Sequence, residues 1–323
     1  MKKIALLTSG GDAPGMNAAI RAVVRTAIYN NVEVYGIYRG YDGLINNDLK
    51  KMGKADVANI IHRGGTVLKT ARSEEFRTLT GRSKAYETLQ SEKIEGLVVI
   101  GGNGTYTGAL KLAEEHEIKV IGVPGTIDND IYGTDYSIGF DTAINTAIDA
   151  VDKIRDTADS HSRLFFIEVM GRHSGYIALH TGIGSGASAI FLPEKENSVL
   201  EYIDTLYKGA RRSKLFNLVI VAEGNTSGNA HDIASIVAKK YEKLDVKTTI
   251  IGHLQRGGSP TASDRVLSSQ LGFHAVEGIL AGQSKVAVGV VNKEVTFTKL
   301  EDAITLKKAP DDSMIHMSEI LAL

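Results

Sequence analysis

Short apolar runs, each followed by a glycine-containing loop and an amphipathic segment, recur along this chain. The runs cover residues 4–7, 97–100, 119–123, 164–169, 218–222 and 248–251. Runs of this length, bounded by glycine, are typical of buried strands. Strands that alternate with helices predict mainly parallel sheets with helices on both faces. In such sheets ligands bind beyond the carboxyl ends of the strands, which is where these loops lie.

Apolar residues at helical spacing predict three amphipathic helices. The first covers residues 17–29, with a stripe of Ile20, Val23, Val24, Ala27 and Ile28. The second carries a stripe of Ile144, Ala147, Ile148, Val151 and Ile154. The third follows Pro260, carries a stripe of Val266, Leu267, Leu271, Ala275, Val276, Ile279 and Leu280, and ends at Gly282. Glycine suits the position just past a helix C-terminus.

The length of the chain restricts its domain organisation, and its charge restricts the class of partner that it can bind. The 323 residues exceed the usual size of a single domain, so we expect two domains. No Pro/Ser-rich linker separates them, so we expect the chain to cross between them more than once, near residues 139–141 and 252. The 37 basic and 38 acidic side chains give no electrostatic reason to expect nucleic acid or a membrane as a partner.

The absence of cysteine and of long apolar runs narrows the class of protein further. Without cysteine there are no disulfides, thiolate metal ligands or cysteine nucleophiles, as is usual in a reducing compartment. No apolar run approaches the roughly 20 residues that span a bilayer. The run after Met1-Lys2-Lys3 is too short for a signal peptide. We therefore expect a soluble, cytoplasmic protein.

Two carboxylates stand in the loop Pro124-Gly125-Thr126-Ile127-Asp128-Asn129-Asp130, directly after an apolar run. Carboxylates at positions i and i+2 can accept a proton from a substrate hydroxyl, position that hydroxyl, or face a metal-bound phosphate. A surface turn is the alternative interpretation, because Asn and Asp favour turns for purely local reasons.

Two glycine-rich loops, residues 10–15 and 101–105, lie between a predicted strand and a predicted helix, where phosphate groups bind well. Neither matches a Walker A loop or a G-x-G-x-x-G motif, and each alone could be a tight turn. Arginines near glycine loops or predicted strand ends favour phosphate binding, and they are Arg63, Arg72, Arg77, Arg163, Arg172 and Arg256. The loops, the arginines and the acidic pair together indicate phosphoryl transfer.

Two other pairs of residues, one of arginines and one of histidines, also need an interpretation. Arg21 and Arg25 stand one helical turn apart, and they form either an ordinary solvated face or a site for an anion. His161 and His253 have no partners at metal-ligand spacing, so we interpret them as hydrogen-bonding groups rather than as zinc ligands.

Four motifs together resemble the bacterial ATP-dependent 6-phosphofructokinases. They are Thr8-Ser9-Gly10-Gly11-Asp12-Ala13-Pro14-Gly15-Met16-Asn17, residues 124–130, Met170-Gly171-Arg172, and Gly252-His253-Leu254-Gln255-Arg256-Gly257-Gly258-Ser259-Pro260. The match runs in order from Lys3 to about Gly289. It implies an α/β protein with two Rossmann-like three-layer α/β/α lobes, mainly parallel sheets and an active site between the lobes.

The resemblance also implies the boundaries, the reaction and the assembly. A nucleotide-binding lobe would comprise residues 1–138 and 252–303, and a sugar-phosphate-binding lobe residues 139–251 and 304–323. The enzyme would phosphorylate fructose 6-phosphate with ATP and Mg²⁺, the committed step of glycolysis. It would be a homotetramer, because the positions of Arg163 and Lys247 project from a neighbouring subunit in this family.

Site residues follow from the resemblance position by position. Asp128 would accept the proton of the sugar 1-hydroxyl, Thr126 would help to hold the transferring group, and Arg172 would stabilise its charge. The substrate would contact Thr126, Asp128, Asp130, Arg163, Met170, Gly171, Arg172, Glu223, Lys247, His253 and Arg256. The nucleotide would contact Gly11, Arg72, Ser73, Gly102, Asn103, Gly104 and Thr105. An effector, ADP or phosphoenolpyruvate, would contact Arg21, Arg25, Arg155, Gly186, Ser188, Arg212 and Lys214.

Three positions depart from the family pattern. Asn103 stands where the family usually has an Asp associated with magnesium, so we expect weaker magnesium dependence or slower turnover. Lys247 replaces an Arg at the inter-subunit phosphate contact, which predicts weaker sugar-phosphate binding. Ser188 replaces a Glu that helps to hold the metal of an activating Mg-ADP. Activation by ADP therefore stays open.

Two alternatives to the ATP-dependent enzyme remain. Relatives that use pyrophosphate carry Asp and Lys at the positions of Gly104 and Gly125, so the small residues here favour ATP. The second alternative is a weakly active or silent regulatory paralogue, suggested by Asn103 and Ser188.

Overall fold

The computed structural model describes residues 1–161, 163–195, 199–200, 203–204 and 218–322. The chain divides into two compact units. The first contains Met1–Thr142 and Arg256–Lys308, and the second contains Ala143–Gln255 and Ala309–Leu323. The chain therefore crosses between the units after residues 142, 255 and 308, whereas the resemblance implied crossings after 138, 251 and 303.

The first unit is built on a seven-stranded sheet with the order β11-β10-β5-β4-β1-β2-β3. Its strands are β1 (Lys3–Thr8), β2 (Glu33–Ile37), β3 (Leu49–Met52), β4 (Gly96–Gly101), β5 (Lys119–Pro124), β10 (Val286–Val291) and β11 (Glu294–Lys299). The five central strands are parallel, and the two edge strands β3 and β11 run antiparallel to their neighbours. The predicted mainly parallel sheet is confirmed.

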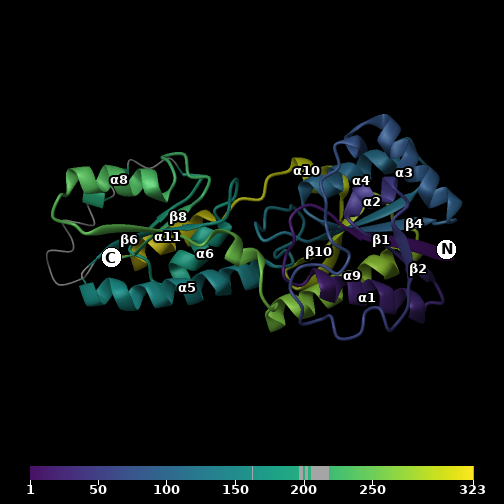
Figure 1. Ribbon diagram of the computed structural model, residues 1–323, viewed down its shortest axis with the longest axis horizontal. Helices are drawn as coiled ribbons and strands as arrows, with labels where there is room; N and C mark the ends of the chain where they lie inside the picture. The colour runs from purple at the N-terminus through teal and green to yellow at the C-terminus, as the bar shows by residue number, and fades with distance from the viewer. Residues whose placement is uncertain (162, 196–198, 201–202, 205–217, 323) are drawn as a thin grey trace. The chain divides into compact units, whose positions relative to one another are not determined.

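Helices cover both faces of this sheet (Figure 1). One face carries α1 (Met16–Tyr29) and α9 (Ala262–Leu280), which pack against each other. The other face carries α2 (Gly40–Ile45), α3 (Leu79–Ser91), α4 (Asn103–Glu115) and α10 (Leu300–Thr305), with the short helix η1 (Glu75–Arg77). The apolar core beneath these helices joins residues of β1 and β4 to Tyr106 and Leu112 of α4.

The second unit is built on a four-stranded parallel sheet with the order β7-β8-β6-β9. Its strands are β6 (Leu164–Val169), β7 (Ala189–Phe191), β8 (Leu218–Ala222) and β9 (Val246–Ile250). Its helices are α5 (Phe140–His161), α6 (Tyr176–Gly184), α8 (Ala230–Lys240) and α11 (Asp312–Leu321), and η2 (Gly252–Arg256) follows β9. None of the described helices is long and apolar enough to cross a membrane.

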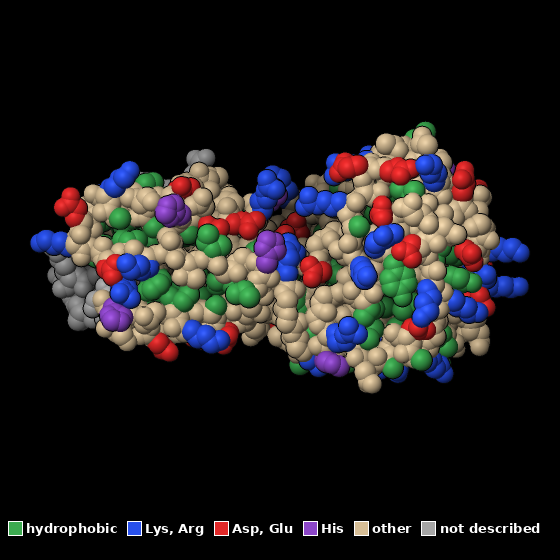
Figure 2. Space-filling view, in the orientation of Figure 1, with side chains coloured by type: hydrophobic (Ala, Val, Ile, Leu, Met, Phe, Trp, Pro, Cys, Tyr) green, Lys and Arg blue, Asp and Glu red, His purple; other side chains and the backbone are tan. Residues whose placement is uncertain are grey.

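Acidic and basic side chains are interspersed on the visible surface of each unit (Figure 2). This mixture agrees with the formal net charge of −1. The face shown presents no extended surface of one sign that would select a partner by charge alone.

The predicted stripe of α1 is buried at Ile20, Val23, Val24 and Ala27, as expected. In α9 the predicted stripe is partly wrong, because Val266 is 68% exposed. The inward positions of its first turns are held by Asp264 and Ser268 instead. Gly282 lies just past the helix with a φ of 92°, as expected for a glycine at this position.

The buried carboxylate of Asp264 explains why a polar residue faces inward there. Its Oδ1 accepts a hydrogen bond from the backbone N–H of Gly139 at 2.8 Å. Its Oδ2 accepts two from Thr142, from the backbone N–H at 2.8 Å and from Oγ1 at 2.5 Å. Burial raises the pKa of the Asp264 carboxyl, and the bonds from Thr142 and Gly139 oppose that rise. Asp264 thus ties the start of α9 to the segment through which the chain leaves the first unit.

Replacing Asp264 by Asn should destabilise the first unit, because the amide group cannot accept all three hydrogen bonds and would point N–H groups at N–H donors. We expect a loss of about 1–3 kcal/mol in the free energy of unfolding, measured by urea denaturation. Asp48→Asn, at a carboxylate that is 43% exposed and paired with Arg39, is the matched control. Equal stability of the two variants would contradict the anchoring role.

Candidate functional site

A cavity of about 640 Å³ opens in the first unit beyond the carboxyl ends of β1, β4 and β5. The loops that follow these three neighbouring strands line the cavity, together with the segment around η1 and the side chain of Arg256. Its volume lies within the usual range for small-ligand sites. Its lining includes Ser9, Gly10, Gly11, Arg72, Ser73, Phe76, Gly102, Asn103, Gly104, Thr105, Gly125, Thr126, Asp128, Asp130 and Arg256.

The loop after β5 alternates between inward and cavity-facing side chains. Ile127 is fully buried and Asn129 is 2% exposed. Thr126, Asp128 and Asp130, the residues between and beside them, are half-buried and line the cavity. The turn at residues 127–128 and the left-handed backbone of Asn129 leave both carboxylates among the residues that line the cavity.

The buried side chain of Asn129 fixes the position of this loop through hydrogen bonds. Its backbone adopts a left-handed conformation with a φ of 53°, which Asn tolerates better than most residues. Its Oδ1 accepts from the backbone N–H of Ser137 at 2.9 Å, and its Nδ2 donates to the Asp135 carbonyl at 3.0 Å. Ser137 Oγ donates to the Thr126 carbonyl at 2.6 Å. The surface-turn interpretation is therefore incomplete, because the turn is anchored through a buried amide.

The two glycine-rich loops lie together at the same edge of the sheet. Thr105 Oγ1 donates to the Ser9 carbonyl at 3.1 Å and joins them. A Cβ on Gly101 would lie 2.3 Å from Thr105 Oγ1 and 2.5 Å from the Ser9 oxygen, so glycine is required for this close approach. Helix α4 begins at Asn103 with no side-chain cap on its N-terminus. Such a terminus in a cavity attracts an anion.

Asn103 and Asp130 lie next to each other in the lining of the cavity. Its Nδ2 lies 3.0 Å from Asp130 Oδ2. A carboxylate can only accept, so the amide must present its NH₂ group to Asp130, which leaves Oδ1 directed elsewhere. Asn103 Oδ1 is buried and has no hydrogen-bond partner among the described residues. A magnesium ion that arrives with a phosphate ligand would satisfy this oxygen, because Mg²⁺ prefers oxygen ligands.

No group of three or more His, Cys, Asp or Glu side chains among the described residues could hold a metal by itself. Magnesium is usually bound through one or two protein oxygens together with substrate phosphates. Asp128, Asp130 and Asn103, which line the cavity, carry oxygens of the kind that this task requires.

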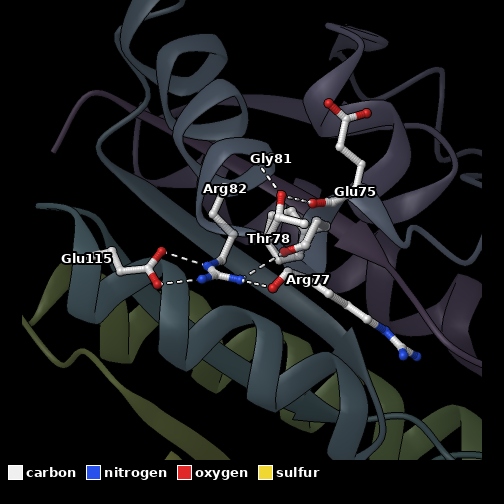
Figure 3. A network of polar contacts seen from close by, with 7 residues as sticks. Glu75, Arg77, Thr78, Gly81, Arg82 and Glu115 are labelled. Atoms are coloured by element: carbon white, nitrogen blue, oxygen red, sulfur yellow. Dashed lines mark hydrogen bonds and ion pairs between the residues drawn. The ribbon is translucent and has the colours of Figure 1, made fainter.

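A buried arginine organises one wall of the cavity (Figure 3). Arg82 on α3 binds Glu115 of α4 through Nε and Nη2, each at 2.6 Å. Its Nη1 donates to the carbonyls of Phe76 at 3.1 Å and Arg77 at 2.7 Å, both in η1. Arg82 lowers the pKa of the Glu115 carboxyl, so the pair stays ionised. One side chain therefore holds η1 against two helices.

Sequence reasoning missed Arg82, Tyr41 and Phe76, all of which line the cavity. The rings of Tyr41 and Phe76 stack at 3.9 Å with an interplanar angle of 11°. Tyr41 Oη donates to the Thr105 carbonyl at 2.5 Å. Gly108 of α4 leaves room for the tyrosine ring, since a Cβ there would lie 2.9 Å from Tyr41. Arg82, Tyr41 and Phe76 come from three different elements, α3, α2 and η1, and their spacing in the sequence does not link them.

The residues expected to contact the nucleotide all line this one cavity, as do Thr126, Asp128, Asp130 and Arg256. Arg256 Nη1 donates to the Asp12 carbonyl at 3.3 Å. The other residues expected to contact the sugar phosphate belong to the second unit, and they are Arg163, Met170, Gly171, Arg172, Glu223, Lys247 and His253.

Within the second unit these residues lie at opposite ends of the sheet. Met170, Glu223 and His253 follow the carboxyl ends of β6, β8 and β9. Gly171 and Arg172 come next after Met170, whose N–H donates to Gln255 Oε1 at 2.8 Å. Arg163 and Lys247 lie at the amino ends of β6 and β9 instead. The six residues of β6 separate the two groups by roughly 20 Å, at ~3.3 Å per residue.

The described residues that are expected to bind an effector are divided between the two units. Arg21 and Arg25 lie on α1 in the first unit, where partial burial and the neighbouring Arg25 lower the pKa of Arg21. In the second unit Arg155 donates to the Ser185 carbonyl, beside Gly186 and Ser188. Arg212 and Lys214 lie outside the described residues.

The phosphofructokinase family model matches residues 3–279. The chain is 54% identical over 323 residues to "ATP-dependent 6-phosphofructokinase 1" of Thermus thermophilus, with 100% of both chains covered. It is 53% identical over 319 residues to "ATP-dependent 6-phosphofructokinase" of Staphylococcus carnosus, with 98% of both covered.

Comparison of folds gives the same result. The solved structure of phosphofructokinase from Saccharomyces cerevisiae matches with a TM-score of 0.89 and 37% identity. The match covers 100% of this chain and 48% of the yeast chain, so this chain spans about half of the yeast chain. The two-lobe α/β architecture and the family resemblance are thus confirmed. The chain belongs to the phosphofructokinase family.

Proposed function

We propose that this protein transfers the γ-phosphoryl group of ATP to the 1-hydroxyl of fructose 6-phosphate, the committed step of glycolysis. The observation that carries the proposal is the cavity that unites Asp128, Asp130 and the uncapped start of α4. It contains an acceptor for a proton and a site for phosphate groups. Full-length relatives named ATP-dependent 6-phosphofructokinase support it.

Asp128 serves as the base in this proposal. It accepts the proton of the sugar hydroxyl as the oxygen attacks phosphorus, and Thr126 orients the transferring group. The Asp128 backbone N–H donates to Thr126 Oγ1 at 3.2 Å, so the two side chains are positioned by one turn. Arg172 of the second unit supplies a fork of donors for the charge on the phosphoryl oxygens.

Magnesium is the proposed cofactor, held by Asp130 and Asn103 Oδ1 with the nucleotide phosphates. When bound, it neutralises the charge of the phosphate oxygens. The protein's own contribution is the orientation of Asp130, whose Oδ2 accepts from the Asn103 amide at 3.0 Å.

We propose that the sugar phosphate is shared between copies of the chain in a homotetramer. Arg163 and Lys247 lie roughly 20 Å, at ~3.3 Å per residue, from Met170 at the other end of β6. That separation exceeds the length of a hexose phosphate, so one copy cannot offer both groups to a single molecule. ADP or phosphoenolpyruvate is the proposed effector, and the cytoplasm the proposed location.

Gly104 and Gly125, the two glycines that favour ATP over pyrophosphate, have different surroundings. A Cβ on Gly104 would meet nothing within 4 Å, so a side chain there would extend into open space beside the cavity. A Cβ on Gly125 would lie 3.0 Å from both Ile100 Cγ2 and Met16 Cε. A large residue at position 125 therefore requires the core beneath it to move.

Gly104→Asp should weaken ATP binding while leaving the fold intact. The carboxylate would stand beside the nucleotide phosphates, and an acid in the first turn of a helix does not destabilise that helix. We expect the KM for ATP to rise at least about tenfold, a loss of ~1.4 kcal/mol, with Tm unchanged. Gly104→Ala is the control, and an equal rise in that variant would show that bulk rather than charge is responsible.

A coupled assay for fructose 1,6-bisphosphate, with ATP or pyrophosphate as the donor, tests the proposed reaction. We expect turnover with ATP and little with pyrophosphate. Asp128→Asn should lower kcat by about 10²- to 10⁴-fold with little change in either KM, because a positioned base contributes that much. Turnover with pyrophosphate alone, or none with either donor, would refute the proposal.

Asn103→Asp should make the site depend more strongly on magnesium. A carboxylate at this position would face Asp130 at hydrogen-bond distance, and the two charges would repel each other unless a cation lay between them. We expect half-saturating magnesium to fall on the order of tenfold, and Tm without magnesium to fall as well.

The control for Asn103→Asp is Asn46→Asp, an exposed amide that donates to the Asp42 carbonyl at 2.9 Å and to its carboxylate at 3.4 Å. Magnesium titrations of activity and of Tm measure both variants. A magnesium requirement that stays the same in Asn103→Asp would contradict the role given to this amide.

A further inference from the structure

Three charged side chains meet at the amino end of the second unit's sheet. Strands β6 and β9 are parallel neighbours in which Leu164 pairs with Val246 and Phe165 with Lys247. This register places the preceding residues, Arg163 and Asp245, opposite each other. Side chains two positions apart in a strand share a face, so Lys247 lies on the same side as Asp245.

One carboxylate holds both cations of this cluster. Asp245 Oδ2 lies 2.8 Å from Arg163 Nε, and Asp245 Oδ1 lies 2.6 Å from Lys247 Nζ. Each carboxylate oxygen thus has its own cationic partner. Hydrogen bonds from Lys247 and, to a smaller extent, from Arg163 lower the pKa of the Asp245 carboxyl. This carboxyl is therefore ionised at neutral pH.

The backbone of the cluster is fixed, whereas its side chains remain accessible. The Leu164 N–H donates to the Asp245 carbonyl at 3.1 Å, and the Arg163 N–H donates to the Ala158 carbonyl at 3.1 Å. The side chains of Arg163, Asp245 and Lys247 are 32%, 47% and 45% exposed. Strand β9 is also the outermost strand of this sheet. An incoming anion can therefore reach both cations without any change in the sheet.

We propose that Asp245 is an internal counter-ion. It forms ion pairs with Arg163 and Lys247 until the phosphate group of the sugar substrate replaces it. This inference rests on the proposed function, in which these two cations bind the 6-phosphate of fructose 6-phosphate in a neighbouring copy. Asp245 is not a catalytic residue. It sets the affinity for the sugar phosphate by competing with it.

The strengths of the competing contacts make such an exchange reversible. Half-exposed ion pairs between single charges are weak because water and salt screen them. A phosphate dianion offers more charge and more acceptor oxygens than a carboxylate, and Arg binds it through a planar fork. The phosphate therefore displaces Asp245, but the substrate must first break two existing pairs. The ammonium group of Lys247 is carried on a flexible four-carbon stem, so it can follow either anion.

Replacing Asp245 by Asn tests the inference, because the amide keeps the shape of the side chain but loses its charge. We expect the KM for fructose 6-phosphate to fall about 2- to 10-fold, the effect expected from losing exposed ion pairs. The kcat and the KM for ATP should stay unchanged. Isothermal calorimetry with fructose 6-phosphate should show the same fall in Kd. Asp149→Asn, at an exposed carboxylate paired with Lys153 on α5, is the matched control.

An unchanged or increased Kd in Asp245→Asn, with Tm equal to that of the wild type, would overturn the inference. The amide of Asp245→Asn could itself donate a hydrogen bond to the phosphate, and Asp245→Ala has no such group. Asp245→Ala must therefore also bind fructose 6-phosphate more tightly than the wild type. Arg163→Ala and Lys247→Ala should each weaken binding, and the loss of Asp245 should no longer matter when both cations are absent. Calorimetry does not need turnover, so an inactive protein that binds the sugar phosphate would refute the proposed reaction and still decide the role of Asp245.

Discussion

The parallel pairing of β1, β4 and β5 is the constraint on which the site depends. It brings three loops that lie far apart in the sequence to one edge of a sheet. Hydrogen bonds extend the pairing past the strands, from the Ser9 N–H to the Ile100 carbonyl and from the Gly125 N–H to the Gly101 carbonyl, each at 3.0 Å. The glycines there let backbone approach backbone. The chemistry of the cavity is therefore positioned by main-chain bonds rather than by mobile side chains.

Buried polar groups then orient what the sheet has brought together. Asn129 supports the loop that carries Asp128, Arg82 holds η1 beside the cavity, and Asp264 ties α9 to Gly139. Each has several hydrogen bonds with fixed partners, which offset the cost of removing a polar group from water. All three contact backbone groups of loops or of the short helix η1, where an apolar residue could not define the position so closely. The first unit thus uses its buried polar residues to define the shape of its site.

The second unit distributes its chemistry differently. Its carboxyl-end loops carry Met170 and Glu223, while Arg163, Asp245 and Lys247 meet at the amino end of the same sheet. A strand separates the two groups, so they serve different molecules of substrate if both bind sugar phosphate. Under the proposed function, affinity is then a property of the assembly, adjusted by one carboxylate that neighbours both cations.

Six of the described strands, three amphipathic helices and the glycine-rich loops follow from the sequence alone, because each depends on spacing within a short segment. The short strands β2, β3, β7, β10 and β11 were not predicted. The sequence also indicated Asp128, Asp130 and the two glycine-rich loops, all of which line one cavity, since motif residues stay close to one another in the chain. It placed Val266 inside the protein wrongly, because a tertiary contact gave the inward position to Asp264. Tertiary contacts determine that Tyr41, Phe76 and Arg82 share a cavity. They also determine that Asn103 donates to Asp130 and that Asp245 pairs with Arg163 and Lys247. Those contacts join residues from different elements, and the spacing within a segment carries no information about them.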